Sequence, residues 1–268
     1  MTNRTKRDLE ILGSLLRRAN PPPTLFRYRR ANEYTLKEIT NYQLFAAAPK
    51  DLNDPFESGA PVRIDEQKLK ASFIDYCVEN KRSSAADAAI EFDSLAITRT
   101  SKLLEQGLDR RRADSGVVSF SAVANSIRMW SYYADSHEGI CIGYKSSFGP
   151  FLAAMKVRYQ NPDEPLDLME ALRTDPAQLA DHVSLRKASE WEFEQEYRLC
   201  VGQIGSRPRL LPFKPEAISE IRFGSRIKDD FREQVLKAIR RLPQKPKLIQ
   251  MGCDLSRFVL TETDLAVT

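Results

Sequence analysis

Apolar and polar side chains alternate most regularly between residues 191 and 201, where the chain reads Trp-Glu-Phe-Glu-Gln-Glu-Tyr-Arg-Leu-Cys-Val. One set of alternate positions is apolar apart from Gln195, and the other carries Glu192, Glu194, Glu196 and Arg198. A period of two residues is typical of a half-buried strand, because successive side chains point to opposite faces of a sheet. The pattern therefore predicts a strand with a row of glutamates along one face.

This row of glutamates needs a physical explanation. Carboxylates two residues apart on a strand lie roughly 7 Å apart and point the same way, so they repel unless a cation lies among them. One interpretation is a solvated outer face on which Arg198 is the cationic partner. The other is a carboxylate pair that meets a cationic centre: a metal, a basic side chain, or a sugar carbon that becomes an oxocarbenium in its transition state.

The other periodicities predict a single α+β domain over residues 1–268. Strands are expected over 25–29, 44–48, 116–121, 139–144, 155–159, 221–224, 247–251 and 258–260. Helices are expected over 8–18, 35–40 with Thr35 as the cap, 125–134, 228–241, and in two insertions at about 65–112, broken at Ser83-Ser84, and 163–189. Prolines 21–23 link the N-terminal helix, within residues 1–23, to the rest of the chain, and Asn53-Asp54-Pro55 predicts a turn covered by Phe56.

Composition narrows the class of protein. The chain has 268 residues, 42% hydrophobic and 29% charged, with a net charge of +4, which is ordinary for a globular protein and permits a nucleic-acid partner. The four cysteines form no CxxC pair and there are only two histidines, so neither a zinc site nor a histidine-based triad is indicated. With no long apolar run and no signal-peptide pattern, we expect a cytoplasmic protein without a membrane partner. The phosphate-binding G-x-G-x-x-G and P-loop motifs and the G-x-S-x-G motif are missing from the sequence.

Several short strings occur in an order that is informative as a set. They are Leu25-Phe26-Arg27-Tyr28-Arg29, Asn53-Asp54-Pro55-Phe56-Glu57, Ser119-Phe120-Ser121, Met129-Trp130-Ser131-Tyr132-Tyr133-Ala134, Gly139-Ile140-Cys141-Ile142-Gly143, Trp191 to Arg198 and Ile221-Arg222-Phe223-Gly224. Together they resemble the bacterial family called domain of unknown function 2971, over about residues 24–260. That family name carries no activity, so the chemistry has to be argued from the residues.

A more distant resemblance is to the ADP-ribosyltransferase fold, which holds NAD in the cleft of a split β-sheet. A polar doublet on the first strand, a Phe-Ser strand end before an aromatic helix, and a glutamate on a late strand follow the order of that fold. The resemblance implies that Arg29 with Tyr28, or Arg27 on the same face as Arg29, holds a ribose or phosphate. It implies that Ser121 and Tyr133 shape the nicotinamide pocket. The first strand has no histidine, and Ser119-Phe120-Ser121 is not the full Ser-Thr-Ser of that family.

The same resemblance implies a catalytic role for the glutamates. Glu196 would stabilise the oxocarbenium as nicotinamide leaves, which electrostatic preorganisation makes worth several kcal/mol. Glu194 would be the additional glutamate of an E-x-E motif, orienting the acceptor or acting as base. Arg29 offers a bidentate fork for the diphosphate. Trp130, Tyr132 and Tyr133 could stack on nicotinamide, or could instead pack the core of their helix.

The implied activity is transfer of ADP-ribose from NAD to a macromolecule, as in a toxin or defence effector. A metal-dependent nuclease with Asp54, Glu194 and Glu196 as oxygen ligands remains an alternative. A non-catalytic binding module, in which the glutamates form a salt-bridged surface, is another. The acceptor is open among protein, DNA, RNA and small molecules, although clustered basic residues would favour nucleic acid.

Overall fold

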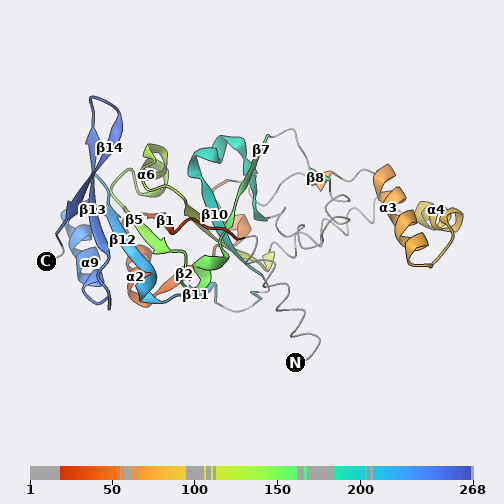
Figure 1. Cartoon of the computed structure of the whole chain (residues 1–268), viewed down its shortest axis with the longest axis horizontal. Coiled ribbons are helices and arrows are strands. Elements are labelled where there is room, and N and C mark those ends of the chain that lie inside the picture. Colours follow the sequence, from red (N-terminus) through yellow and green to blue (C-terminus); the bar gives the residue numbers. More distant parts are fainter. Residues whose placement is uncertain are drawn as a thin grey trace.

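The computed structural model describes residues 19–54, 56, 62–63, 66–94, 106, 110, 113–161, 166–167, 184–202, 204–205 and 208–266. The helix expected over 8–18 and most of the insertion expected over 163–189 lie outside these residues. The described part of the chain is mixed α+β, built on a large and mostly antiparallel sheet (Figure 1). The expected α+β class is therefore confirmed.

Eight strands of the described residues form the main sheet. Across the sheet they are β14 (Val259–Leu265), β13 (Lys247–Asp254), β12 (Ile218–Phe223), β5 (Ile140–Lys145), β1 (Thr24–Arg29), β4 (Gly116–Ser121), β10 (Glu196–Val201) and β6 (Met155–Lys156). Within the sheet, β12 and β13 run parallel and the other described neighbours run antiparallel. Three small pairs lie outside it: β2 (Gln43–Phe45) with β11 (Leu210–Pro212), β3 (Val62–Arg63) with β8 (Leu166–Asp167), and β7 (Arg158–Gln160) with β9 (Arg186–Ala188).

At the centre of the sheet, β1 pairs unequally with its two neighbours. Strand β1 pairs with β5 along its whole length, from Thr24 to Arg29. Its other edge pairs with β4 at Phe26 and Ser121, and the register continues no further. Beyond that pair the backbones of β1 and β4 part, so polar groups of both strands become available to a cavity between them.

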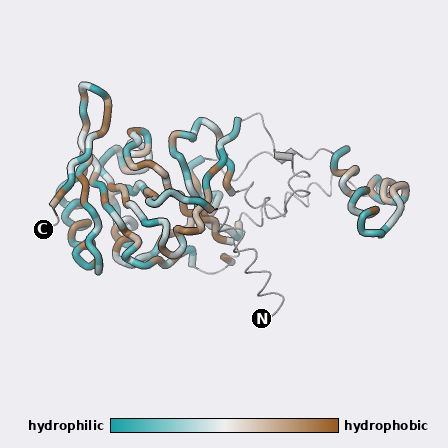
Figure 2. The backbone as a smooth tube through the Cα atoms, in the orientation of Figure 1, coloured by the Kyte–Doolittle hydropathy of each residue, from teal (hydrophilic) through white to brown (hydrophobic). Residues whose placement is uncertain are grey.

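Helices cover both faces of the sheet. The α2 helix (Glu33–Asn41) and the α9 helix (Asp229–Ile239) pack over one face, where Leu25, Ile39 and Val235 belong to the larger apolar core. The α6 helix (Ile127–Tyr133) packs over the opposite face, with Tyr28 and Trp130 in a second apolar cluster. Figure 2 shows hydrophobic residues along the strands between these helices. Because side chains alternate along a strand, Arg27 and Arg29 share the face of Leu25, towards α2.

The remaining described elements are small or stand apart. The α3 helix (Glu66–Glu79) and the α4 helix (Ala85–Ser94) pack on each other through Phe73 and Phe92, away from the sheet (Figure 1). The break between them at Ser83-Ser84 is where the sequence predicted it. Four short 3-10 helices are η1 (Pro49–Asp51), η2 (Gly149–Ala153), η3 (Ser189–Glu194) and η4 (Pro215–Ala217). Within the described ranges, no helix has the length and apolar character needed to cross a membrane.

Several expected details are wrong. The N-cap of α2 is Asn32 and not Thr35, since the Asn32 side chain accepts the backbone N–H of Thr35 at 3.1 Å. Thr35 itself lies inside the helix, and its hydroxyl donates to the Arg30 carbonyl. Phe56 is 79% exposed and does not bury the turn before it. The strand expected over 155–159 is divided into β6 and β7, which pair with different partners. Residues 186–188, expected within a helix, form β9.

The largest correction concerns residues 191–201. The first half is not a strand, because Ser189 to Glu194 form the 3-10 helix η3 and Gln195 takes a left-handed conformation with φ of 44°. The strand begins only at Glu196. Its charged side is also the buried one, since Glu196 is 2% exposed and Arg198 is fully buried. The interpretation of this row as a solvated outer face is therefore wrong.

Candidate active site

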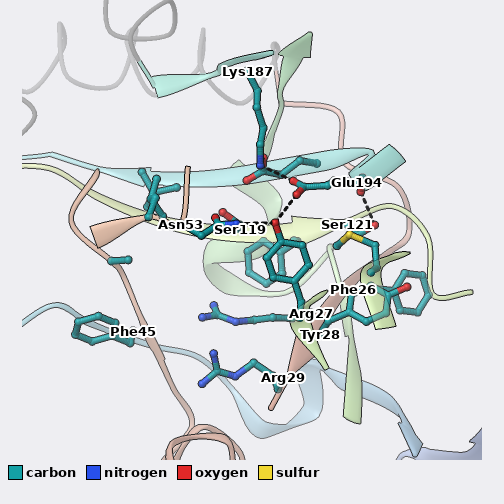
Figure 3. Close-up of a pocket in the computed structure, with 17 residues that line it drawn as sticks. Phe26, Arg27, Tyr28, Arg29, Phe45, Asn53, Ser119, Ser121, Lys187 and Glu194 are labelled. Atoms are coloured by element: carbon teal, nitrogen blue, oxygen red, sulfur yellow. Dashed lines mark hydrogen bonds and ion pairs between the residues drawn. The ribbon is translucent and has the colours of Figure 1, made fainter. Parts of the chain in front are cut away.

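A cavity of about 270 Å³ lies where β1 and β4 part. Its walls come from the central strands, from α6, from the segment that follows β2, and from the β9–β10 region (Figure 3). The lining residues are Phe26, Arg27, Tyr28, Arg29, Phe45, Ala47, Leu52, Asn53, Val117, Ser119, Phe120, Ser121, Met129, Tyr133, Lys187, Glu194 and Glu196. One wall carries arginines and another carries glutamates.

The structure brings most of the residues expected at the site into this cavity. Those that line it are Arg27, Tyr28, Arg29, Ser121, Tyr133, Glu194 and Glu196. Trp130 does not line it. Its indole is fully buried in the core, donates a 2.8 Å hydrogen bond to the Ala124 carbonyl and packs edge-on against Tyr28. Of the two roles left open for Trp130, core packing is therefore the one that the structure shows, because its ring lies on the core side of α6.

Glu196 is held by two cationic side chains. Arg198 lies two residues along the same strand and donates from Nε and Nη2 to the two carboxylate oxygens, at 2.7 and 2.9 Å. Lys187 Nζ approaches the same carboxylate at 3.2 Å. On β4, Ser121 and Ser119 lie directly across from Glu196 and Arg198. This register places a small polar residue opposite each charged one, which leaves room for the buried ion pair.

Glu194 reaches the same place by a different route. The left-handed turn at Gln195 brings the end of η3 back over the start of β10, and the Ser121 hydroxyl donates a 2.6 Å hydrogen bond to the Glu194 carbonyl. The Glu194 carboxylate then accepts the Tyr133 hydroxyl at 2.6 Å and Lys187 Nζ at 2.5 Å (Figure 3). The two glutamates converge because of this turn, and not because they share one face of a strand.

The environments of the two glutamates push their pKa values in opposite directions. Burial alone would raise the pKa of Glu196, but Arg198 and Lys187 hold it at about 2. Burial also raises the pKa of Glu194, and repulsion from Glu196 adds to the rise, while Lys187 and Tyr133 offset only part of it. A pair of carboxylates with separated pKa values is the arrangement in which one stays ionised while the other exchanges a proton.

A second network of charges forms the arginine wall. Glu38 of α2 is 3% exposed, accepts the Tyr144 hydroxyl at 2.7 Å, and lies 3.1 Å from Arg29 Nε and 3.6 Å from Arg27 Nε. Arg27 Nη1 is buried and finds no hydrogen-bond partner within the described ranges. Burial lowers the pKa of Arg27, and Arg29 lowers it further, although a guanidinium keeps its charge in proteins.

The arginine wall also borders a second cavity of about 630 Å³. Arg27, Arg29 and Phe45 line both cavities. The other residues of the second cavity come from α2, β2 and β11, and are Asn32, Tyr34, Lys37, Glu38, Asn41, Gln43 and Leu210. The two arginines therefore lie between a glutamate-lined space and a larger one.

The carboxylates are poorly arranged for a metal. Among the described residues, no group of three His, Cys, Asp or Glu side chains is placed to hold a metal ion. Asp54, expected as a ligand in the nuclease alternative, accepts the backbone N–H of Phe56 at 2.9 Å and is not among the residues that line the cavity. Lys187 and Arg198 already occupy the oxygens of Glu194 and Glu196.

Sequence reasoning missed several residues of the site. The sequence predicts a helical insertion at Lys187, and no local pattern marks this residue as a partner of the glutamates. The sequence predicts a turn at Asn53, but does not indicate that its amide donates to the Tyr133 hydroxyl, at 3.1 Å. Tyr159 accepts the backbone N–H of Glu196 at 2.8 Å. The sequence offered one signal for the burial of Glu38. This glutamate lies in the helix that directly follows the strand bearing Arg27 and Arg29.

Comparison of the chain with protein-family models, with curated proteins and with solved structures finds no match. The functional argument therefore depends on the geometry of the site and on the sequence resemblance described above.

Proposed function

We propose that this chain is an NAD-dependent ADP-ribosyltransferase with a split-sheet fold like that of the ADP-ribosyltransferases. The domain of unknown function 2971 family, which the chain also resembles, would then share this fold. The observation that carries this proposal is the pairing of two unlike walls across one cavity. One wall has more cationic side chains than carboxylates, and the other has two buried glutamates with opposite pKa shifts. NAD has an anionic diphosphate, which matches the arginine wall, and a cationic nicotinamide ring, which matches the glutamate wall.

The arginine wall suits the diphosphate. Arg27 and Arg29 share the single carboxylate of Glu38, and Arg27 Nη1 has no hydrogen-bond partner in the part of the chain that the structure describes. Buried donors of this kind are normally satisfied, so an anion that accepts from Arg27 would remove a desolvation cost already present. The second cavity, on the far side of the two arginines, offers space for the adenosine portion.

The glutamate wall suits the reacting ribose. NAD supplies a ribose carbon whose bond to nicotinamide breaks, with the bonding electron pair leaving on nicotinamide. Glu196 stays ionised, and its negative charge stabilises the positive charge that develops on that carbon, although Arg198 neutralises part of this effect. Glu194 accepts the proton of the acceptor as the acceptor lone pair bonds to the ribose carbon. The aromatic ring of Tyr133 lines the cavity beside Glu194.

The proposal extends to the setting but not to one acceptor. An ADP-ribosyltransferase of this design would act in the cytoplasm as a toxin or defence effector, and its acceptor would be a macromolecule. The nuclease alternative has less support, since ligand oxygens of Glu194 and Glu196 are engaged by Lys187 and Arg198. A binding module would use the same cavity without turnover.

The experiment that tests the proposal follows both halves of NAD. The chain is incubated with cell lysate and either nicotinamide-labelled or adenine-labelled NAD, with and without a metal chelator. Release of nicotinamide and labelling of a macromolecule, insensitive to the chelator, are expected, and digestion with nuclease or protease identifies the acceptor. Glu194→Gln should lower the rate about 100- to 10,000-fold, the range of general acid–base catalysis. Absence of NAD binding, together with chelator-sensitive cleavage of nucleic acid, would replace this proposal with the nuclease.

A further inference from the structure

Lys187 is the cation that joins the two glutamates. Its Nζ lies 2.5 Å from Glu194 Oε2 and 3.2 Å from Glu196 Oε2, and its side chain is 3% exposed. The same ammonium stands 4.9 Å from the centre of the Trp191 ring, which is a favourable cation–π position. A buried lysine is costly unless it is paired, so this position indicates a specific use.

The backbone fixes where Lys187 stands. Strand β9 pairs with β7 so that Lys187 lies directly across from Tyr159. The Tyr159 hydroxyl in turn accepts the backbone N–H of Glu196, at 2.8 Å. Lys187 is thus tied to the first residue of β10 through its strand partner, as well as through its ammonium. The β7–β9 pair sets the position of the ammonium relative to both carboxylates.

Charged and titratable groups reach Glu194 from every neighbouring element. Lys187 comes from β9, Tyr133 from α6, Tyr159 from β7, and Glu196, neutralised by Arg198, from β10. Of these groups, Lys187 and Tyr133 favour the ionised form of Glu194, while burial and Glu196 disfavour it. Lys187 is a cation in direct contact with the Glu194 carboxylate, so the protonation of Glu194 depends strongly on it.

We propose that Lys187 is a positioning residue that holds the two carboxylates together and sets how readily Glu194 exchanges a proton with the acceptor, while Lys187 and Arg198 together keep Glu196 ionised. The assignment of the acceptor step rests on the proposed transferase function. In that step the acceptor O–H or N–H gives its proton to Glu194 and its lone pair to the ribose carbon. Nicotinamide leaves with the electrons of the broken bond, and the ammonium of Lys187 keeps its proton throughout.

A titration that needs no NAD tests the assignment. Glutamate is labelled with ¹³C at the side-chain carboxyl, and Glu194→Gln and Glu196→Gln identify the two resonances. In Lys187→Met, the titration midpoint of Glu194 should rise by about 1–3 pH units, the usual effect of losing an opposite charge at contact distance. Lys187→Arg, which keeps the charge, should restore most of the wild-type midpoint. Lys156→Met, on exposed β6, is the control and should leave both midpoints in place.

A second measurement uses the wild type alone, in case Lys187→Met fails to fold. The ¹⁵N resonance of Lys187 Nζ should shift with the same midpoint as the Glu194 carboxyl, because the two atoms are in direct contact. Independent titration of the two groups, or an unmoved Glu194 midpoint in Lys187→Met, would overturn the proposal.

Activity separates this proposal from the transferase function. The acid limb of the pH profile for nicotinamide release should move upward in Lys187→Met by the same interval as the NMR midpoint. If the midpoint moves and no variant releases nicotinamide, the transferase function fails while the link between Lys187 and Glu194 stands. If release is normal and its acid limb does not move in Lys187→Met, the positioning role fails.

Discussion

Two buried charge networks face the same cavity and differ in their balance. Around Glu38, two arginines share one carboxylate, and Arg27 Nη1 has no hydrogen-bond partner among the described residues. Around Glu194 and Glu196, Lys187 and Arg198 match two carboxylates with two cations. The first network has a surplus of positive charge. The second has equal numbers of cationic side chains and carboxylates, but the pKa of Glu194 is raised and that of Glu196 is lowered.

The difference indicates what each network can do. A wall with a surplus of buried donors suits an anionic ligand, because the ligand can accept hydrogen bonds from donors that have no partner among the described residues. A balanced pair whose pKa values are driven apart is suited to proton transfer. A site that combines both can hold an anionic ligand at one wall and carry out chemistry at the other.

Removing a cation from the balanced network should have the largest effect. Arg198→Met leaves Glu196 buried with Lys187 as its remaining contact among those described above, so the free energy of unfolding should fall by about 3–5 kcal/mol. The measurement is denaturant-induced unfolding. The double variant Arg198→Met/Glu196→Met should recover much of the loss, because no buried charge is then left unpaired. Arg257→Met, which breaks an exposed ion pair with Asp254, should cost at most about 1 kcal/mol. Equal losses in the two single variants would contradict a buried ion pair at Glu196.

The pH dependence of stability should show the two glutamates separately. The pKa of Glu196 is about 2 in the folded chain, against an ordinary value of about 4.3. At pH values above its ordinary pKa, Glu196 therefore contributes on the order of 3 kcal/mol to the free energy of unfolding, and this contribution is lost as the pH falls towards 2. The pKa of Glu194 is raised, so its contribution is present at low pH and is lost as pH rises through its folded pKa.

Comparison of the wild type with Glu194→Gln isolates the upper part of that profile. Unfolding free energies are measured between about pH 3 and 7. The wild type should lose stability above the ordinary glutamate pKa relative to the variant, whereas both should lose it together at the acid end. Parallel curves over the whole range would mean that the pKa of Glu194 is not raised.

The arginine network should matter for ligand binding more than for folding. In Arg29→Met, Glu38 keeps Arg27 and the Tyr144 hydroxyl, so folding should be retained. Loss of a charge-assisted contact should weaken NAD binding roughly 10- to 100-fold, measured by calorimetry. Arg257→Met again serves as the control, with binding unchanged. Unaltered NAD affinity in Arg29→Met would remove this wall from the binding site.

The smallest expected effect is at Tyr133. Tyr133→Phe removes the hydroxyl that donates to Glu194 and accepts from Asn53, which should lower the unfolding free energy by about 1 kcal/mol. Tyr132→Phe is the matched control, because that ring is 56% exposed on the same helix. Tyr133→Phe should also raise the pKa of Glu194, since a donor to its ionised form is lost. A titration of Glu194 that is identical in both variants would contradict this contact.

Sequence reasoning was accurate where a local period carries the information. The alternation at Leu25 to Arg29 predicted β1 and the shared face of Arg27 and Arg29, and the apolar run at Gly116 to Ser121 predicted β4. The same reasoning failed at residues 191–195, because a 3-10 turn with alternating apolar residues resembles a strand when only the period is considered. The sequence leaves Trp130 open between a ligand pocket and the core for a related reason, since helical spacing does not say which side of a helix meets the core.

The sequence by itself determined most strands of the main sheet, the arginine doublet and the presence of closely spaced glutamates, because these depend on neighbours along the chain. Only the tertiary structure decided that β1 and β4 pair at Phe26 and Ser121 alone, and that Glu194 and Glu196 meet through the turn at Gln195. It also decided that Lys187 and Arg198 are the cations that make burial of the two glutamates tolerable. Coulomb interactions and desolvation depend on distance in space and on exclusion of water, which a linear sequence does not record.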